Sequence, residues 1–155
     1  MDVFEAYSRQ DPSAHLLLIG DGKLRSEIEK NIAEKGLRDR VLVLGKRADV
    51  DKLYQSMDVF VLPSLWEGLP VTLVEAQTAG LQCVVSNTVT REVNITGNIQ
   101  YLGIGPEDVE TWVNALQSIR QENRTRFGWS NHIVKSVLNI ANSVDDLLGI
   151  YGSAK

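Results

Sequence analysis

The chain alternates short apolar runs with longer segments of mixed polarity. The runs are continuous rather than alternating, which is typical of strands that are buried on both faces of a parallel sheet. They lie at His15–Gly20, Val41–Gly45, Val59–Pro63, Cys83–Asn87 and, with a weaker pattern, Ile99–Gly103. We therefore expect five strands, each covered on both sides by other elements.

The segments between the runs carry apolar residues at the three- and four-residue spacing of amphipathic helices. Within the first of these segments, Leu24, Ile28 and Ile32 would form the buried stripe of a helix. Strand–helix alternation predicts right-handed βαβ units, and hence a doubly wound, Rossmann-like α/β fold with a parallel sheet and three α/β/α layers. Helices are expected over Leu24–Lys35, Asp49–Met57, Val71–Ala79 and Glu107–Arg120, and the end of another over Asp2–Gln10.

Composition and charge narrow the class of protein. The 155 residues, 43% hydrophobic and 23% charged, fit one globular domain, which we divide into a core at 1–122 and a helical tail at 123–155. The net charge of −4 argues against nucleic acid as a partner, because phosphate binding needs a basic surface. The single cysteine, Cys83, is expected in the core. Without a signal-peptide pattern or an apolar stretch of ~20 residues, we expect a cytoplasmic protein.

Residues that follow the strands are the candidate site, because doubly wound sheets bind ligands beyond the carboxyl ends of their strands. After the first strand, Gly20, Asp21 and Gly22 form a turn that lets the backbone approach a ligand. The same residues also suit a plain tight turn, because the full dinucleotide motif is absent. After the second strand, Lys46 and Arg47 could neutralise phosphate, although each also fits an ordinary surface charge.

The segment after the third strand carries the more specific pattern. Gly68 permits close backbone approach, and Pro70 is expected at the first helical position, where free N–H groups would bind an anion such as a diphosphate. Glu75 lies roughly 7–8 Å further along the helix, about the step from a diphosphate to its ribose. Because the helix is largely apolar, we expect Glu75 to be well packed and paired. Glu67 alone would be a favourable charge near a helix N-terminus.

These motifs, taken in order, resemble one known family. From Leu16 to about Arg120, the chain is similar to the C-terminal, donor-binding domain of retaining glycosyltransferases with the GT-B fold. The similarity is to the group 1 family, which includes capsular and exopolysaccharide enzymes. The motifs are G-x-G at Gly20–Gly22, D-V-F-V-x-P-S from Asp58, E-G-x-P from Glu67 and E-A-x-x-x-G from Glu75.

The resemblance implies a role for each candidate residue. Glu75 would bind the ribose hydroxyls of the donor, and Glu67 would contact the donor sugar or stabilise charge as the glycosidic bond breaks. The donor would be a nucleotide sugar, with UDP as the expectation from the family, and neither a cofactor nor a bound metal is implied. The backbone at Gly68, Leu69 and Pro70 would hold the diphosphate, Gly20–Gly22 would lie along the nucleotide, and Lys46 and Arg47 would border the base.

The resemblance also implies parts of an enzyme outside this chain. In the family, a further strand and loop open the donor domain and supply an arginine and a lysine for the diphosphate, and an N-terminal domain binds the acceptor. We therefore expect a truncated piece with little turnover of its own, from an enzyme that is cytoplasmic or peripheral to the membrane. Its sheet would have an open edge that favours self-association unless the tail covers it.

Two other functions remain open from the residues themselves. One is a non-catalytic α/β module that binds a nucleotide or a protein. The other is a flavodoxin-like receiver or cofactor domain, although the acidic cluster that it needs after the first strand is reduced here to Asp21.

Overall fold

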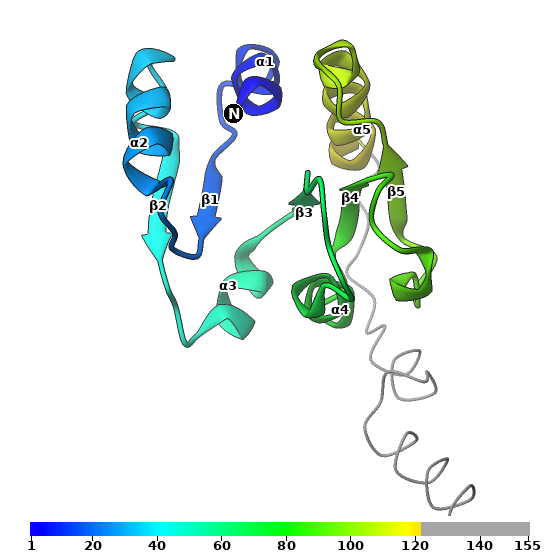
Figure 1. Cartoon of the computed structure of the whole chain (residues 1–155). Coiled ribbons are helices and arrows are strands. Elements are labelled where there is room, and N and C mark those ends of the chain that lie inside the picture. The colour runs from blue at the N-terminus through cyan, green and yellow to red at the C-terminus, as the bar shows by residue number, and fades with distance from the viewer. Residues whose placement is uncertain (122–155) are drawn as a thin grey trace, which may run out of the picture.

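Strands and helices alternate along residues 1–121, which is the part of the chain that the computed structural model describes (Figure 1). The expected tail lies outside these residues. Each expected strand and helix of the described part is present, with ends that agree to within about two residues. The strands are β1 (Leu16–Ile19), β2 (Val41–Gly45), β3 (Val59–Leu62), β4 (Gln82–Ser86) and β5 (Ile99–Leu102). The α-helices are α1 (Asp2–Gln10), α2 (Arg25–Glu34), α3 (Val50–Ser56), α4 (Val71–Thr78) and α5 (Val109–Gln121).

The strands form three layers with the helices, as expected for a doubly wound α/β fold. In Figure 1, α1, α2 and α5 lie on one side of the strands, and α3 and α4 lie on the other. Every strand pair in the described residues is parallel, but the pairs belong to two sheets, β1–β2 and β3–β4–β5. The single sheet that the sequence predicts is therefore interrupted between β1 and β3. No helix among residues 1–121 is long and apolar enough to cross a membrane.

The three-stranded sheet holds the larger core. Its middle strand, β4, is fully buried from Cys83 to Ser86, as expected for Cys83, and burial raises the pKa of that thiol to about 12. One face of the sheet packs against α3 and α4 through Tyr54 and Leu73. The opposite face packs against α5, where the Trp112 indole N–H also donates to the Gly103 carbonyl.

The two-stranded sheet holds a smaller core, formed by Phe4, Ile32, Leu37 and Val41. The stripe predicted for α2 is only partly correct, because Leu24 and Ile28 are 63% and 38% exposed and Ile32 alone is buried. A sheet of two strands offers a helix little surface to cover. The outer residues of α2 therefore remain in solvent although their spacing is helical.

Candidate functional site

The loop that joins β3 to α4 ends at a helix start with unpaired backbone donors. Pro70 is the N-cap of α4 with an extended backbone, and not the first helical residue as the sequence predicts. Its carbonyl accepts the N–H of Leu73 at 3.0 Å. No side-chain hydrogen bond caps the helix. The amides of Val71 and Thr72, in its first turn, therefore have no acceptor within the helix. This end carries the partial positive charge of the helix and suits an anion.

Glu75 lies on α4 and faces a cavity. Its Oε2 accepts a hydrogen bond from the hydroxyl of Tyr54 at 3.1 Å, so the expected partner exists. The expected close packing is wrong, because Glu75 is exposed, whereas Leu73, Ala76 and Gln77 form the buried side of the helix. Apolar residues occur around most of this short helix, so their pattern does not reveal which side is buried.

Glu67 is exposed and lies in a loop that is anchored to the next strand. The Ser64 hydroxyl donates to Oε1 of Glu67 at 2.6 Å. The carbonyl of Ser64 in turn accepts hydrogen bonds from the hydroxyls of Ser86 and, at 2.8 Å, Thr88. The last residue of β4 and a residue just beyond it therefore hold Ser64, the second residue of the loop that carries Glu67.

The two basic residues after β2 differ in their pairing. Arg47 donates from Nε and Nη2 to the two carboxylate oxygens of Asp49, each at 2.8 Å. These hydrogen bonds raise the pKa of Arg47 and lower the pKa of Asp49. Lys46 is exposed and has no ion pair with the residues that the structure describes. Lys46 is therefore the more available charge for an anion.

The sequence left two interpretations of the turn after β1 open, a ligand contact and a plain tight turn, and its residues differ in which of them they fit. Gly20 has φ of +125° and lines the cavity. Asp21 instead supports the turn itself, because its Oδ1 accepts the N–H of Gly22 at 2.9 Å and its Oδ2 lies 3.8 Å from Nη1 of Arg25. This geometry favours a structural role for Asp21 and Gly22.

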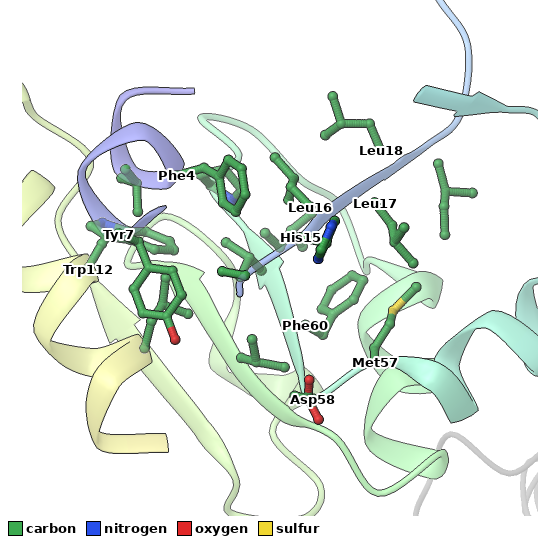
Figure 2. A pocket seen from close by; sticks show the side chains of 18 of the residues that line it. Phe4, Tyr7, His15, Leu16, Leu17, Leu18, Met57, Asp58, Phe60 and Trp112 are labelled. Atoms are coloured by element: carbon green, nitrogen blue, oxygen red, sulfur yellow. The ribbon is translucent and has the colours of Figure 1, made fainter. Parts of the chain in front are cut away.

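Four of the predicted site residues line one cavity of about 2240 Å³: Gly20, Lys46, Arg47 and Glu75. The remaining ones lie outside its lining, namely Asp21, Gly22, Glu67, Gly68, Leu69 and Pro70. Small-molecule sites usually measure about 300–1,000 Å³, so one such ligand would occupy only part of this space. Figure 2 shows the apolar remainder, between side chains of β1 such as Leu17, the ring of Phe60 on β3, and Trp112 of α5.

The sequence did not identify Tyr54, Ser64, Ser86 or Thr88 as site residues. Ser64 comes after β3, and Ser86 ends β4, so their place at the carboxyl ends of strands is the signal that could have marked them. Tyr54 belongs to the apolar stripe of α3, and the signal there is that a buried tyrosine hydroxyl usually needs a hydrogen-bond partner.

Known proteins resemble this chain in sequence and, among solved structures, in fold. A family model described as "Glycosyl transferases group 1" matches residues 1–133. The chain is 33% identical over 144 residues to UDP-Gal:alpha-D-GlcNAc-diphosphoundecaprenol alpha-1,3-galactosyltransferase of Escherichia coli, a match that covers 90% of this chain and 37% of that one. It is 38% identical over 84 residues to the Vi polysaccharide biosynthesis protein VipC/TviE of Salmonella typhi, covering 54% and 14%.

A solved structure extends the comparison to the fold. The crystal structure of the pneumococcal O-GlcNAc transferase GtfA in complex with UDP and GlcNAc has a TM-score of 0.79 at 16% identity, covering 96% of this chain and 31% of that one. The chain thus spans 37%, 14% and 31% of the lengths of these three proteins. Because the family model matches most of its residues, the chain belongs to the group 1 glycosyl transferases.

Proposed function

We propose that this chain is the donor-binding domain of a glycosyltransferase that moves a sugar from a nucleotide diphosphate sugar to a saccharide or lipid-linked acceptor, with retention. One observation carries the proposal: Glu75 faces the cavity, is held by Tyr54, and follows the uncapped start of α4. A carboxylate can accept hydrogen bonds from two neighbouring ribose hydroxyls. The amides at the helix start suit the diphosphate.

The other candidate residues take their places around this pair of features. Gly68, Leu69 and Pro70 bring the backbone to the diphosphate, and the Gly20 turn and Lys46 border the nucleotide. Glu67, held by Ser64, stabilises the charge that develops as the glycosidic bond breaks. The Arg47 charge is matched by Asp49 and contributes less.

The acceptor is bound by parts of the enzyme outside this chain. We infer a lipid-linked acceptor and a UDP-sugar donor from the name of the Escherichia coli relative, and an enzyme that works beside the cytoplasmic face of a membrane. An acceptor-binding domain would cover the exposed apolar side chains around the donor loop, which isolated domains seldom present as a group. These side chains are Leu65, Trp66, Leu69 and Val71.

We also propose that the isolated chain self-associates through the facing edges of β1 and β3. Leu16 and Gly20 donate their amides to the carbonyls of Arg40 and Gly45 on the β2 side. Because alternate residues of a strand turn their amides to opposite edges, the amide of Leu17 points to the other edge. No strand pairs with that edge in residues 1–121. Open edges of this kind recruit another strand. Analytical ultracentrifugation tests this: a chain that stays monomeric at every concentration contradicts it.

A non-catalytic nucleotide-binding module is the second candidate, because Glu75, its partner Tyr54 and the uncapped start of α4 could bind a nucleotide without any transfer. Turnover separates the two candidates. A full-length enzyme rebuilt around this chain would transfer sugar to a polyprenyl diphosphate saccharide under the first, and would bind nucleotide without transfer under the second.

Titration calorimetry with UDP, UDP-sugars and GDP tests the donor site in the chain itself. Glu75→Ala should weaken UDP binding at least about tenfold, because hydrogen bonds to charged groups are worth about 1.5–3 kcal/mol each. The matched control is Glu110→Ala on α5, an exposed helix glutamate outside the cavity lining. The proposal fails if no nucleotide binds at millimolar concentration, or if the two variants bind UDP equally.

A further inference from the structure

The hydroxyl of Tyr54 sits between two acceptors of α4. It lies 3.1 Å from Oε2 of Glu75 and 3.2 Å from the carbonyl oxygen of Thr72. Tyr54 belongs to α3, a different helix, and is only 4% exposed. One buried side chain therefore contacts both the candidate ribose ligand and the first turn of the helix whose start would bind the diphosphate.

The ring of Tyr54 is held rigidly. It packs edge-to-face on Phe60 of β3, with ring centroids 6.1 Å apart and an interplanar angle of 66°. It also belongs to the larger core, together with Leu73 and Ala76 of α4. Burial, followed by the charge of Glu75, raises the pKa of Tyr54, so the hydroxyl keeps its proton at neutral pH. The core thus delivers a hydrogen-bond donor at a fixed point beside an otherwise exposed carboxylate.

A tyrosine hydroxyl has one proton and cannot donate to both acceptors at once. Hydrogen bonds to ionised acceptors are roughly twice as strong as those between neutral groups, so the hydroxyl donates to Oε2 of Glu75 when nothing else binds the carboxylate. Rotation about the C–O bond can instead turn the O–H group towards the Thr72 carbonyl, without movement of the ring. The hydroxyl can therefore hold Oε2 of Glu75 while Oε1 remains available to a ligand.

We propose that Tyr54 is a positioning residue for nucleotide binding: its hydroxyl holds Glu75 in the rotamer that faces the cavity, and leaves Oε1 free for the ribose. This inference rests on the proposed donor site and adds a second residue to it. A free glutamate side chain loses rotamer entropy when a ligand fixes it. With Tyr54 present, much of that loss has already occurred on folding, so the ligand binds more tightly.

The variant Tyr54→Phe tests this role because it removes the hydroxyl and keeps the buried ring. We expect it to weaken UDP binding about three- to tenfold with little change in the unfolding midpoint. The loss should shrink towards none for 2′,3′-dideoxy-UDP, which offers Glu75 no ribose hydroxyl. It should also vanish in a Glu75→Ala background, since the hydroxyl acts only through that carboxylate.

A merely structural role for Tyr54 predicts another result. Tyr54→Phe would then weaken UDP and its dideoxy analogue by the same factor, and would weaken both again in the Glu75→Ala background. Either finding overturns the proposal. Equal UDP affinity for wild type and Tyr54→Phe overturns it as well.

A measurement without nucleotide separates this inference from the donor site itself. Side-chain NMR order parameters of Glu75 in the ligand-free chain should fall in Tyr54→Phe, while those of Glu110, the matched exposed glutamate, stay unchanged. If the order parameter of Glu75 falls in the variant but wild type binds no UDP, the proposed donor site is contradicted, and the inference that Tyr54 holds Glu75 stands. If the order of Glu75 is the same in both proteins, the tether is wrong whatever UDP does.

Discussion

The β3–β4–β5 half and the β1–β2 half follow the same sequence pattern but differ in burial. In the first, β4 has a strand on each side and a helix layer on each face, and its residues Cys83 to Ser86 are fully buried. In the second, β1 has one strand neighbour, and all its residues are half-buried. Burial in a parallel sheet depends on neighbours along the sheet as much as on the layers above and below. Equal hydrophobicity of two strands therefore does not mean equal contribution to stability.

Two tryptophans give the largest contrast. Trp112 is 2% exposed in the larger core, whereas Trp66 is 90% exposed in the loop that joins β3 to α4. Trp112→Ala should lower the free energy of unfolding by about 3–5 kcal/mol, and Trp66→Ala should change it by no more than about 0.5 kcal/mol. Chemical denaturation of both variants measures this. Similar losses would mean that the loop around Trp66 is packed in solution.

Two isoleucines of α2 test the smaller core. Ile32 is 4% exposed and Ile28 is 38% exposed, one turn apart on the same helix. Ile32→Ala should cost about 2–3 kcal/mol, near the low end for such a change because a small core can relax around the gap. Ile28→Ala should cost much less. If the order is reversed, Ile28 is covered in solution by a surface that the described residues do not supply.

A glycine at the end of β2 tests the local backbone of the same half. Gly45 has φ of +64°, and a Cβ atom there would meet Nη1 of Arg25 at 3.2 Å. Gly45→Ala should therefore cost about 1–2 kcal/mol, mostly from the left-handed backbone. In the control Gly22→Ala, the new methyl group meets nothing within 4 Å and φ is not positive. Thermal unfolding of the two variants measures this difference in stability. Equal unfolding midpoints would contradict the backbone strain assigned to position 45.

Acid should produce the smallest effect, at the contact between α1 and the end of α2. Hydrogen bonds from Lys35 lower the pKa of Asp2 and of Glu5 below their ordinary values of 3.8 and 4.5. The unfolded chain therefore binds protons first, and this contribution to stability is lost as pH falls below about 4.5. Lys35→Met should flatten the acid limb of a stability-against-pH curve. An unchanged limb would show that the pairs contribute nothing measurable.

The sequence predicts the elements well because each strand and helix is a local pattern. It predicts their neighbours less well. The interruption between β1 and β3 depends on which strands pair, and no single run of residues encodes that. The exposure of Ile28 depends on the width of the sheet beneath α2.

The candidate site shows the same division. Glu75 can be identified from its place after Pro70, because helix rise converts sequence separation into distance. Its hydroxyl partner cannot, since Tyr54 lies 21 residues away on another helix and its position follows only from how α3 packs on α4. Glu67 and its tether Ser64 are three residues apart, yet a serine there has no distinctive pattern.

The carbonyl oxygen of Ser64 accepts two hydrogen bonds, and this affects how the loop tolerates mutation. Two hydroxyls, a buried one from Ser86 and an exposed one from Thr88, reach the same acceptor. Substitution of Thr88 leaves the hydrogen bond from Ser86 in place. The exposed position 88 can therefore change in sequence while Ser86 keeps the loop attached to β4. A double-mutant cycle with Ser86→Ala and Thr88→Val should therefore be strongly non-additive. The loop that carries Glu67 thus has a built-in redundancy, and its geometry would survive the loss of either single bond.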